Sequence, residues 1–245
     1  MSESEAAHIF RDHLSEEDYE ASATAQSLDE LVSIAKYLDP HREEINTILD
    51  LGCGYGGLTS AFAKYLEADE IHGIDLDGDR RSVAETRGIQ THNVDLESDR
   101  FPLSDGDVDL VLSFGVLEHL KYYDNAMMES NRVLRDDGFV LYSVPNLGSW
   151  INRINLLFGN QPRDVEISEE RAFGISGFYP TTSSLNHVHS PTLGAFIELL
   201  EYYDIEIVEV EGIFPYQTNK IVKMIDRVFS SFPSLCRRVV VLGQK

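Results

Sequence analysis

The 245-residue sequence has few cysteines, few lysines and no long apolar run. Its two cysteines, Cys53 and Cys236, are too few for a disulfide framework or a clustered thiolate zinc site, which indicates an intracellular protein. No stretch approaches the roughly 20 consecutive apolar residues that a transmembrane helix needs. Residues 1–10 lack the basic and apolar regions of a signal peptide. We therefore expect a cytoplasmic protein that does not span a membrane.

The charge of the chain is strongly one-sided. Asp and Glu number 42 against 20 Lys and Arg, a net charge of −22, and only six of the cations are lysine. This excess of acid disfavours a nucleic-acid partner, because a polyanion is attracted by Lys and Arg patches. An acidic, lysine-poor composition is similar to that of proteins from salt-loving archaea, where molar salt screens self-repulsion. An ordinary acidic cytosolic protein is the alternative.

Pattern and charge divide the chain into regions. Segment 1–25 is acidic and shows little apolar periodicity, so we expect a solvated N-terminal arm. Segment 26–245 alternates between strand-like and helix-like patterns, and we predict that it forms a single domain. Within it, segment 145–190 is long for a connection, and loops of this length are commonly lids or binding segments. We therefore predict that segment 145–190 is a lid.

The C-terminal region reverses the charge of the rest. Residues 213–245 contain six bases and one acid. Within them, segment 219–232 has apolar residues on one helical side, and Lys220, Lys223 and Arg227 lie elsewhere around the axis. Two interpretations of this cationic amphipathic helix stay open. Its apolar side packs on the domain, or it contacts the anionic cytoplasmic face of a membrane.

The alternation of elements predicts the fold class. Parallel neighbouring strands need a crossover, and a helical crossover places helices on both faces of the sheet. The chain is therefore expected to be α/β and doubly wound. The expected strands are 47–51, 71–75, 89–94, 108–114 and 139–144, and the expected helices are 58–67, 78–87, 125–134 and 192–203.

A glycine-rich turn follows the first expected strand. Gly52, Gly54, Gly56 and Gly57 come between that strand and the next helix. Glycine allows positive φ, and without a Cβ the backbone can approach a ligand at the helix N-terminus. The spacing of Gly52, Gly54 and Gly57 also satisfies the dinucleotide fingerprint G-x-G-x-x-G. The turn therefore predicts a nucleotide-like ligand, with a ligand-free turn as the ordinary alternative.

Two acidic residues follow the next two strands. Asp75 ends the second strand, where a carboxylate can accept both hydroxyl groups of a ribose. Asp95 follows the third strand, where it can accept from an adenine amino group while the Leu96 amide donates to the ring. The pair therefore suits an adenosine. Each acid could instead cap a helix.

These segments together resemble the class I S-adenosylmethionine-dependent methyltransferases. The similarity covers residues 48–134 closely and includes Leu117-Glu118-His119-Leu120. The family implies a seven-stranded, mostly parallel Rossmann-like sheet with an antiparallel final strand, which a classical nicotinamide domain lacks. It also implies the cofactor S-adenosyl-L-methionine, held at its amino-acid end, ribose and adenine by Asp50, Gly52, Gly54, Gly56, Asp75, Leu76, Asp95 and Leu96.

Histidines are the expected acid–base groups for a hydroxyl acceptor, because their pKa lies near neutrality. His119 follows the fourth strand, and His187 and His189 precede the expected helix 192–203. We predict that one of these three histidines is catalytic, with a loop or capping role as the alternative for each. No spacing of acids singles out metal ligands, so no metal is expected.

The acceptor is less specified than the cofactor. The lid, basic helix and acidic composition are similar to those of methyltransferases of surface-glycan assembly, including the haloarchaeal type that methylates a hexuronic acid on a lipid-carried glycan. That resemblance implies a sugar or lipid-linked glycan acceptor, in the context of protein glycosylation and the S-layer. O-methylation of a quinone-like or other small metabolite, and a non-catalytic cofactor-binding partner protein, stay open as alternatives.

Overall fold

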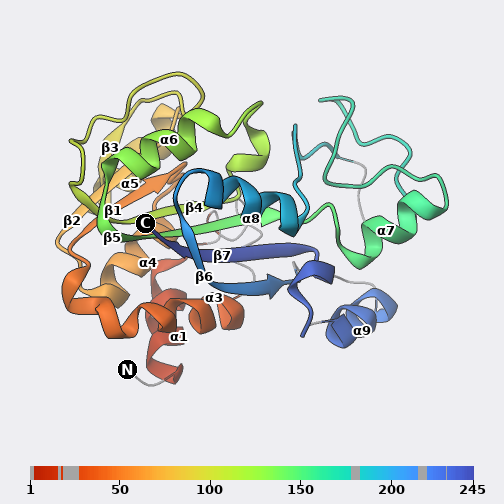
Figure 1. Ribbon diagram of the computed structural model, residues 1–245, viewed down its shortest axis with the longest axis horizontal. Helices are drawn as coiled ribbons and strands as arrows, with labels where there is room; N and C mark the ends of the chain where they lie inside the picture. The colour runs from red at the N-terminus through yellow and green to blue at the C-terminus, as the bar shows by residue number, and fades with distance from the viewer. Residues whose placement is uncertain (1–2, 16–17, 19–27, 178–182, 215–219, 230) are drawn as a thin grey trace.

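The computed structural model describes residues 3–15, 18, 28–177, 183–214, 220–229 and 231–245 (Figure 1). A seven-stranded sheet forms its centre, in the order β3-β2-β1-β4-β5-β7-β6. The strands are β1 (Thr47–Leu51), β2 (Glu70–Ile74), β3 (Gln90–His92), β4 (Val108–Phe114), β5 (Leu134–Pro145), β6 (Glu206–Ile213) and β7 (Arg238–Gln244). The first five run parallel, and β7 is antiparallel to both β5 and β6. The expected fold, including the reversed final strand, is confirmed.

Helices cover both faces of this sheet (Figure 1). The elements are α1 (Glu3–His13), α3 (Leu28–Ala35), α4 (Gly57–Leu66), α5 (Gly78–Thr86), α6 (Asp124–Val133), α7 (Trp150–Leu157), α8 (Leu193–Tyr202) and α9 (Lys220–Phe229), with 3-10 helices η1 (Lys36–Glu44), η2 (Leu117–His119) and η3 (Pro233–Leu235). One face packs against α1, α3 and α4, and the other against α6 and α8. Every helix in the described part of the chain is too short or too polar to cross a bilayer.

Consecutive residues of the central strands face opposite sides of the sheet. Ile48 of β1 packs into the core under α4, whereas its neighbour Leu49 packs into the core under α6. Leu110 and Val111 of β4 divide in the same way. All five residues of β1 are buried, including the polar Thr47 and Asp50, because helices cover both sides of this central parallel strand. Strand β1 has the bounds expected from the sequence. Strand β5 begins earlier than expected, and β3 is shorter than expected.

The expectation of a solvated N-terminal arm is wrong for residues 3–14. Helix α1 packs on α4, and Ala6, Phe10 and Leu14 are buried in the main core. The ring of Phe10 meets that of Phe62 edge-on, with centroids 4.9 Å apart. The apolar residues recur every fourth position, which places them on one side of a helix despite the surrounding acids. Segment 19–25 lies outside the described residues.

Helices α7 and α9 pack together beside the sheet (Figure 1). Trp150 of α7 stacks on Phe229 of α9 with ring centroids 6.2 Å apart, and its indole N–H donates to Asp226 at 2.8 Å. Arg237 also pairs with Asp226, at 2.9 Å. The basic amphipathic helix therefore packs one of its sides on the domain, as the first interpretation expected. Residues 219 and 230 of this segment lie outside the described residues.

Candidate functional site

A cavity of about 1100 Å³ opens at the carboxyl ends of the parallel strands. This edge is where open α/β sheets bind ligands, because the loops that leave several strands converge there. Loops after β1, β2, β3, β4 and β5 line it, together with parts of segment 145–190 and the start of β7. The lining includes these predicted residues: Asp50, Gly52, Gly54, Asp75, Leu76, Asp95, Leu96, His119 and His187. Gly56 lies in the same turn, and His189 does not line the cavity.

The glycine turn brings backbone close to the cavity. Gly52 has φ +74°, and a Cβ there would lie 2.2 Å from a methyl carbon of Val116, so only glycine fits between the two loops. The amide N–H groups of Gly52 and Cys53 both donate to the carbonyl of Ile74, at 2.7 and 2.9 Å. Gly54 also has positive φ, but no heavy atom of the described residues lies within 4 Å of its Cβ position. The turn is therefore fixed on one side by hydrogen bonds to Ile74 and is open on the side of Gly54.

Asp50 supplies an unsatisfied buried carboxylate oxygen in this wall. Its side chain is 3% exposed, and Oδ2 accepts a hydrogen bond from the Thr59 hydroxyl at 2.6 Å. Oδ1 is buried and has no hydrogen-bond partner among the described residues. Burial raises the pKa of Asp50 to about 7, and the nearby charge of Asp75 adds to the rise. A cationic ligand group beside Oδ1 would supply the missing partner and favour the ionised carboxylate.

Asp75 connects two loops of the cavity rather than capping a helix. Its Oδ2 accepts from the Gly54 amide at 2.9 Å, and its Oδ1 accepts from the Asp77 amide at 2.8 Å. The N-cap of α5 is Asp77, whose side chain accepts from the amides of Asp79 and Arg80. Each Asp75 oxygen keeps a second lone pair, so both can still accept a ligand hydroxyl.

Asp95 lies in the cavity wall but also stabilises its own turn. Its Oδ1 accepts from the amide of Glu97 at 2.9 Å, and its backbone amide donates to Asp99. These bonds hold a turn, and no helix begins here in the described stretch between β3 and β4, so Asp95 is not a helix cap. Leu96, also in the wall, is 6% exposed, whereas Leu76 is 65% exposed and presents a bare apolar side chain beside the cavity.

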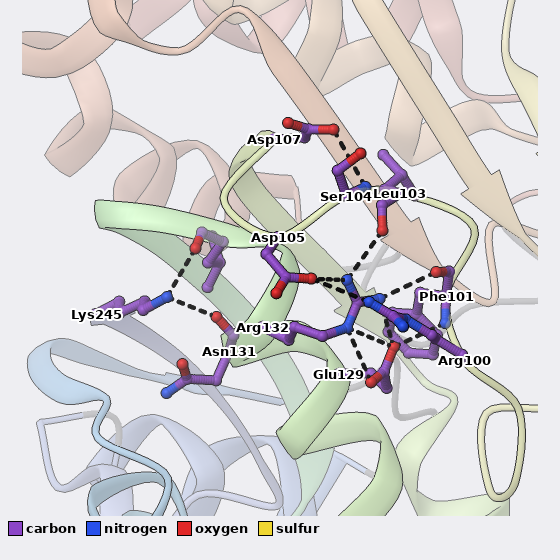
Figure 2. A network of polar contacts seen from close by, with 11 residues as sticks. Arg100, Phe101, Leu103, Ser104, Asp105, Asp107, Glu129, Asn131, Arg132 and Lys245 are labelled. Atoms are coloured by element: carbon purple, nitrogen blue, oxygen red, sulfur yellow. Dashed lines mark hydrogen bonds and ion pairs between the residues drawn. The ribbon is translucent and has the colours of Figure 1, made fainter.

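A partly buried guanidinium, that of Arg132, fixes the loop between β3 and β4, which contains Asp95 and Leu96. Arg132 of α6 donates to both carboxylate oxygens of Glu129 and to the carbonyls of Phe101 and Leu103, as Figure 2 shows. It also bonds Asp105 at 2.7 Å. One side chain of α6 thus holds the segment that connects β3 to β4 at several points.

Glu118 is the buried centre of the other end of the cavity. It is 1% exposed, and its Oε1 accepts from Arg238 Nη2 at 2.6 Å. Burial alone would raise the pKa of Glu118, but the charge and hydrogen bond of Arg238, together with smaller contributions from His187 and the backbone, hold the pKa below its usual value. The backbone carbonyl of Glu118 accepts from the amides of Val188 and His189. These bonds attach segment 185–189 to the loop after β4.

Two of the three predicted histidines meet beside Glu118. The rings of His119 and His187 are 5.1 Å apart, and the Nε2 atom of His187 lies 3.8 Å from Glu118 Oε1. His119 Nδ1 lies 2.9 Å from the carbonyl oxygen of Asn186. Burial lowers the pKa of His187 to about 4, so its imidazole is neutral at pH 7. His189 is exposed and lies near the ring of Tyr122 instead.

Several residues at this end were given no role from the sequence. Arg163, Asp164, Asn186 and Arg238 line the cavity with Glu118. Of these, only Glu118 had a local signal, because it is adjacent to the candidate His119. Arg238 begins the last strand and reaches Glu118 across 120 positions, a contact that no local pattern reveals.

Comparison with known proteins supports the resemblance inferred from the motifs. Residues 49–142 match the family model of a methyltransferase domain. Malonyl-[acyl-carrier protein] O-methyltransferase from Geobacter sulfurreducens is 31% identical over 54% of this chain and 50% of its own length. Cyclopropane-fatty-acyl-phospholipid synthase from Escherichia coli is 29% identical over 50% of this chain and 34% of its own length. The chain spans half or less of the length of these curated relatives.

Solved structures match over more of the chain. An S-adenosylmethionine-dependent methyltransferase from Mesorhizobium loti has a TM-score of 0.54 and 17% identity, covering 81% of this chain and 90% of its own. Another, from Archaeoglobus fulgidus, has a TM-score of 0.52 and 16% identity, covering 86% of this chain and 93% of its own. At these identities the likeness shows a shared fold. Together with the match of residues 49–142 to the methyltransferase-domain model, this shared fold makes the chain similar to class I S-adenosylmethionine-dependent methyltransferases and implies the cofactor S-adenosyl-L-methionine.

The cavity fits this cofactor. The open face at Gly54 leaves room for a ligand against the backbone, and the unpartnered Asp50 oxygen suits an ammonium group. Asp75 retains acceptor capacity for a diol. The volume also exceeds what one drug-sized ligand commonly occupies, which leaves space for a second molecule.

Proposed function

We propose that the chain transfers a methyl group from S-adenosyl-L-methionine to an oxygen atom of an acceptor held in the same cavity. The observation that carries this proposal is the two-ended cavity. Its first end is formed by the glycine turn and the acids after β1 to β3, and its second by Glu118, the two histidines and the arginines. A transferase of two substrates needs both sites to meet.

Each residue of the first end is assigned to one part of the cofactor. We assign Gly52, Gly54 and Gly56 to its amino-acid end and Asp50 to its ammonium group. We assign the ribose diol to Asp75. The adenine is assigned to Leu76, Asp95 and Leu96. When bound, the cofactor supplies a methyl carbon activated by its sulfonium. The protein contributes placement, which can account for several kcal/mol of a barrier.

We assign His119 and His187 to activation of the acceptor hydroxyl. Replacing either by alanine is expected to lower turnover by about 100-fold or more, because hydroxyl acceptors react poorly until they lose the proton. Affinity for the cofactor should stay within about threefold in calorimetry, since neither side chain belongs to the first end. His189→Ala is the matched control and should retain turnover, because His189 lies outside the cavity wall. Normal turnover in both His119→Ala and His187→Ala would remove histidine from the mechanism.

We propose a hexuronic acid in a glycan or glycolipid as the acceptor. The second end of the cavity is lined by Arg163, Arg237 and Arg238, each of which pairs with one acid, although the protein as a whole carries a net charge of −22. Guanidinium groups suit the carboxylate of a uronic acid better than an uncharged metabolite. The acidic, lysine-poor composition supports a salt-loving source, so the assay belongs at high salt.

Transfer of label identifies the acceptor class. The purified chain is incubated with methyl-labelled cofactor and a cell extract at molar salt, and the products are separated into glycan, lipid and small-molecule fractions. Label in uronic acid released from glycan or glycolipid is the expected result. Label in a small metabolite would overturn the glycan acceptor, and label in no fraction would support a non-catalytic cofactor-binding protein. Asp75→Ala, which should bind cofactor poorly, provides the background.

We further propose that α9 contacts an anionic membrane surface. Beside the packed side of α9 lies an exposed apolar stripe of Ile221, Met224 and Val228, each more than 60% exposed. Lys220, Lys223 and Arg227 flank it. Exposed apolar side chains bordered by cations are typical of helices that lie in a bilayer interface. The neighbouring helix α7 reaches the cavity through Ile151, so this surface lies near the second end.

Vesicle flotation tests this contact. The full chain should float with vesicles that contain phosphatidylglycerol and much less with phosphatidylcholine alone. Met224→Gln combined with Val228→Gln should reduce the floated fraction several-fold, because the buried apolar area decreases. The matched control, Tyr202→Gln with Val208→Gln, removes exposed apolar groups from other elements and should float normally. Flotation that is absent, or equal in both double variants, would contradict the membrane contact.

A further inference from the structure

Glu118, His119 and His187 converge although the sequence spacing predicts no metal site. One nitrogen or oxygen atom from each of these three residues lies within 4.8 Å of the others. We propose that these side chains bind a divalent transition-metal ion of the Zn²⁺ or Mn²⁺ type. The metal site is inferred from these three side chains alone, whereas its role in acceptor activation rests on the proposed function.

Two of the ligand side chains have buried atoms that lack a partner. Glu118 is 1% exposed, and its Oε2 has no hydrogen bond to any residue that the structure describes. His187 is 9% exposed, and its Nδ1 has none within the same described residues. Leaving a buried polar atom unsatisfied costs about 1–3 kcal/mol, so native proteins rarely keep two together without a purpose. The unused acceptor capacity on these two side chains favours a cation bound beside them.

The surrounding contacts hold the ligands in the form that a metal needs. The carbonyl of Asn186 can only accept, so the proton of neutral His119 lies on Nδ1 and the lone pair on Nε2. Arg238 holds the other oxygen of Glu118 and is itself bonded to the hydroxyl of Ser143. Such outer contacts fix the tautomer and direction of metal ligands in known sites.

The donor set selects the kind of ion. Two imidazoles and one carboxylate suit zinc, manganese or iron, whereas magnesium and calcium prefer oxygen ligands alone. Three protein ligands leave a position open, as in catalytic zinc sites, and here the open side is the cavity. Metal–ligand bonds of about 2.1 Å require the three atoms to move closer together. The exposed side chain of His119 has the freedom to do so.

A cation at this position would explain how the second end activates an acceptor. A bound divalent ion lowers the pKa of a coordinated hydroxyl and stabilises its negative charge. The hydroxyl oxygen can then form its bond to the methyl carbon while the carbon–sulfur bond breaks and its electron pair stays on sulfur. The released proton passes to solvent through the open cavity. No oxidant or reductant is needed.

Titration of the full chain with Co²⁺, followed by competition with Zn²⁺, tests the site without any acceptor. One ion per chain should give a visible absorption band typical of mixed nitrogen and oxygen ligands, and Zn²⁺ should remove it. His119→Ala and His187→Ala should each weaken binding by about 100-fold or more. His189→Ala, a histidine two positions further along the same segment, should bind normally. Glu118→Gln removes the anionic ligand and should also weaken metal binding, while its amide oxygen can still accept from Arg238.

The outcomes separate this inference from the proposed function. Thermal unfolding curves first establish that each variant is folded, and the exposed position of His119 makes its variant the safest. Absence of the visible band in the unaltered chain, or an equal band in His119→Ala and His189→Ala, would overturn the metal site. Calorimetry with S-adenosyl-L-methionine is carried out on the same samples. Cofactor binding without metal binding would leave the methyltransferase proposal intact.

Discussion

Replacing Asp75 by alanine is expected to weaken the binding of S-adenosyl-L-methionine about 100-fold. The carboxylate is assigned two charge-assisted hydrogen bonds to the ribose, and such bonds contribute about 1.5–3 kcal/mol each. It also accepts the amide of Gly54 at 2.9 Å, so its removal frees the glycine turn. A loss of about 2.7 kcal/mol corresponds to the expected factor. Isothermal calorimetry on the folded variant measures it.

Asp77→Ala is the matched control for this experiment. Asp77 lies two positions further on and caps α5, but it does not line the cavity. Its loss should lower the stability of the protein by about 1 kcal/mol, as is usual for an N-cap. The affinity for the cofactor should change less than about threefold. Equal affinities in the Asp75 and Asp77 variants would refute the ribose assignment.

Arg132→Met is expected to lower the free energy of unfolding by about 3 kcal/mol. Glu129 has a side chain only 8% exposed, and Arg132 holds its carboxylate at 2.6 Å. Removing one partner of a buried pair leaves an uncompensated charge, which costs about 3–5 kcal/mol. The carbonyls of Phe101 and Leu103 also lose their donor (Figure 2). Chemical denaturation measures the change, and the melting temperature should fall by about 10 °C.

Arg100→Met provides the comparison at the surface. Arg100 pairs with Asp105 at 3.2 Å, but both side chains are about 70% exposed. Exposed pairs contribute little, so this substitution should change stability by less than about 1 kcal/mol. If both variants lost the same stability, the network around Arg132 would not be the anchor of the loop between β3 and β4.

The sheet was predictable because its signals are local and strong. The β1 pattern, the glycine turn and the order of elements each follow from short stretches of sequence. Helix α1 was missed for a physical reason. Its inward side rests on Ala6, Phe10 and Leu14, with Ala7 and Ile9 partly buried beside them, and charged and polar residues on either side dominate the composition. So short an apolar group is a weak signal until the matching surface of α4 is known.

The candidate site also has one part that the sequence predicts and one part that it does not. The residues assigned to the cofactor lie within one stretch of about 50 positions, and their spacing alone predicts that they meet at one edge of the sheet. The other end is assembled by contacts between distant segments. Arg238 reaches Glu118 from the last strand, and His187 reaches it from the 145–190 segment. No periodicity records such contacts, so the convergence with His119 appears only in the folded chain.

A crystal structure of the chain with S-adenosyl-L-methionine tests the central claim most directly. The claim predicts the cofactor in the cavity, with its ribose hydroxyls on Asp75, its ammonium group beside Asp50 and its methyl group directed toward Glu118 and His119. Density for the cofactor elsewhere, or a cavity filled by protein side chains at saturating cofactor, would contradict it.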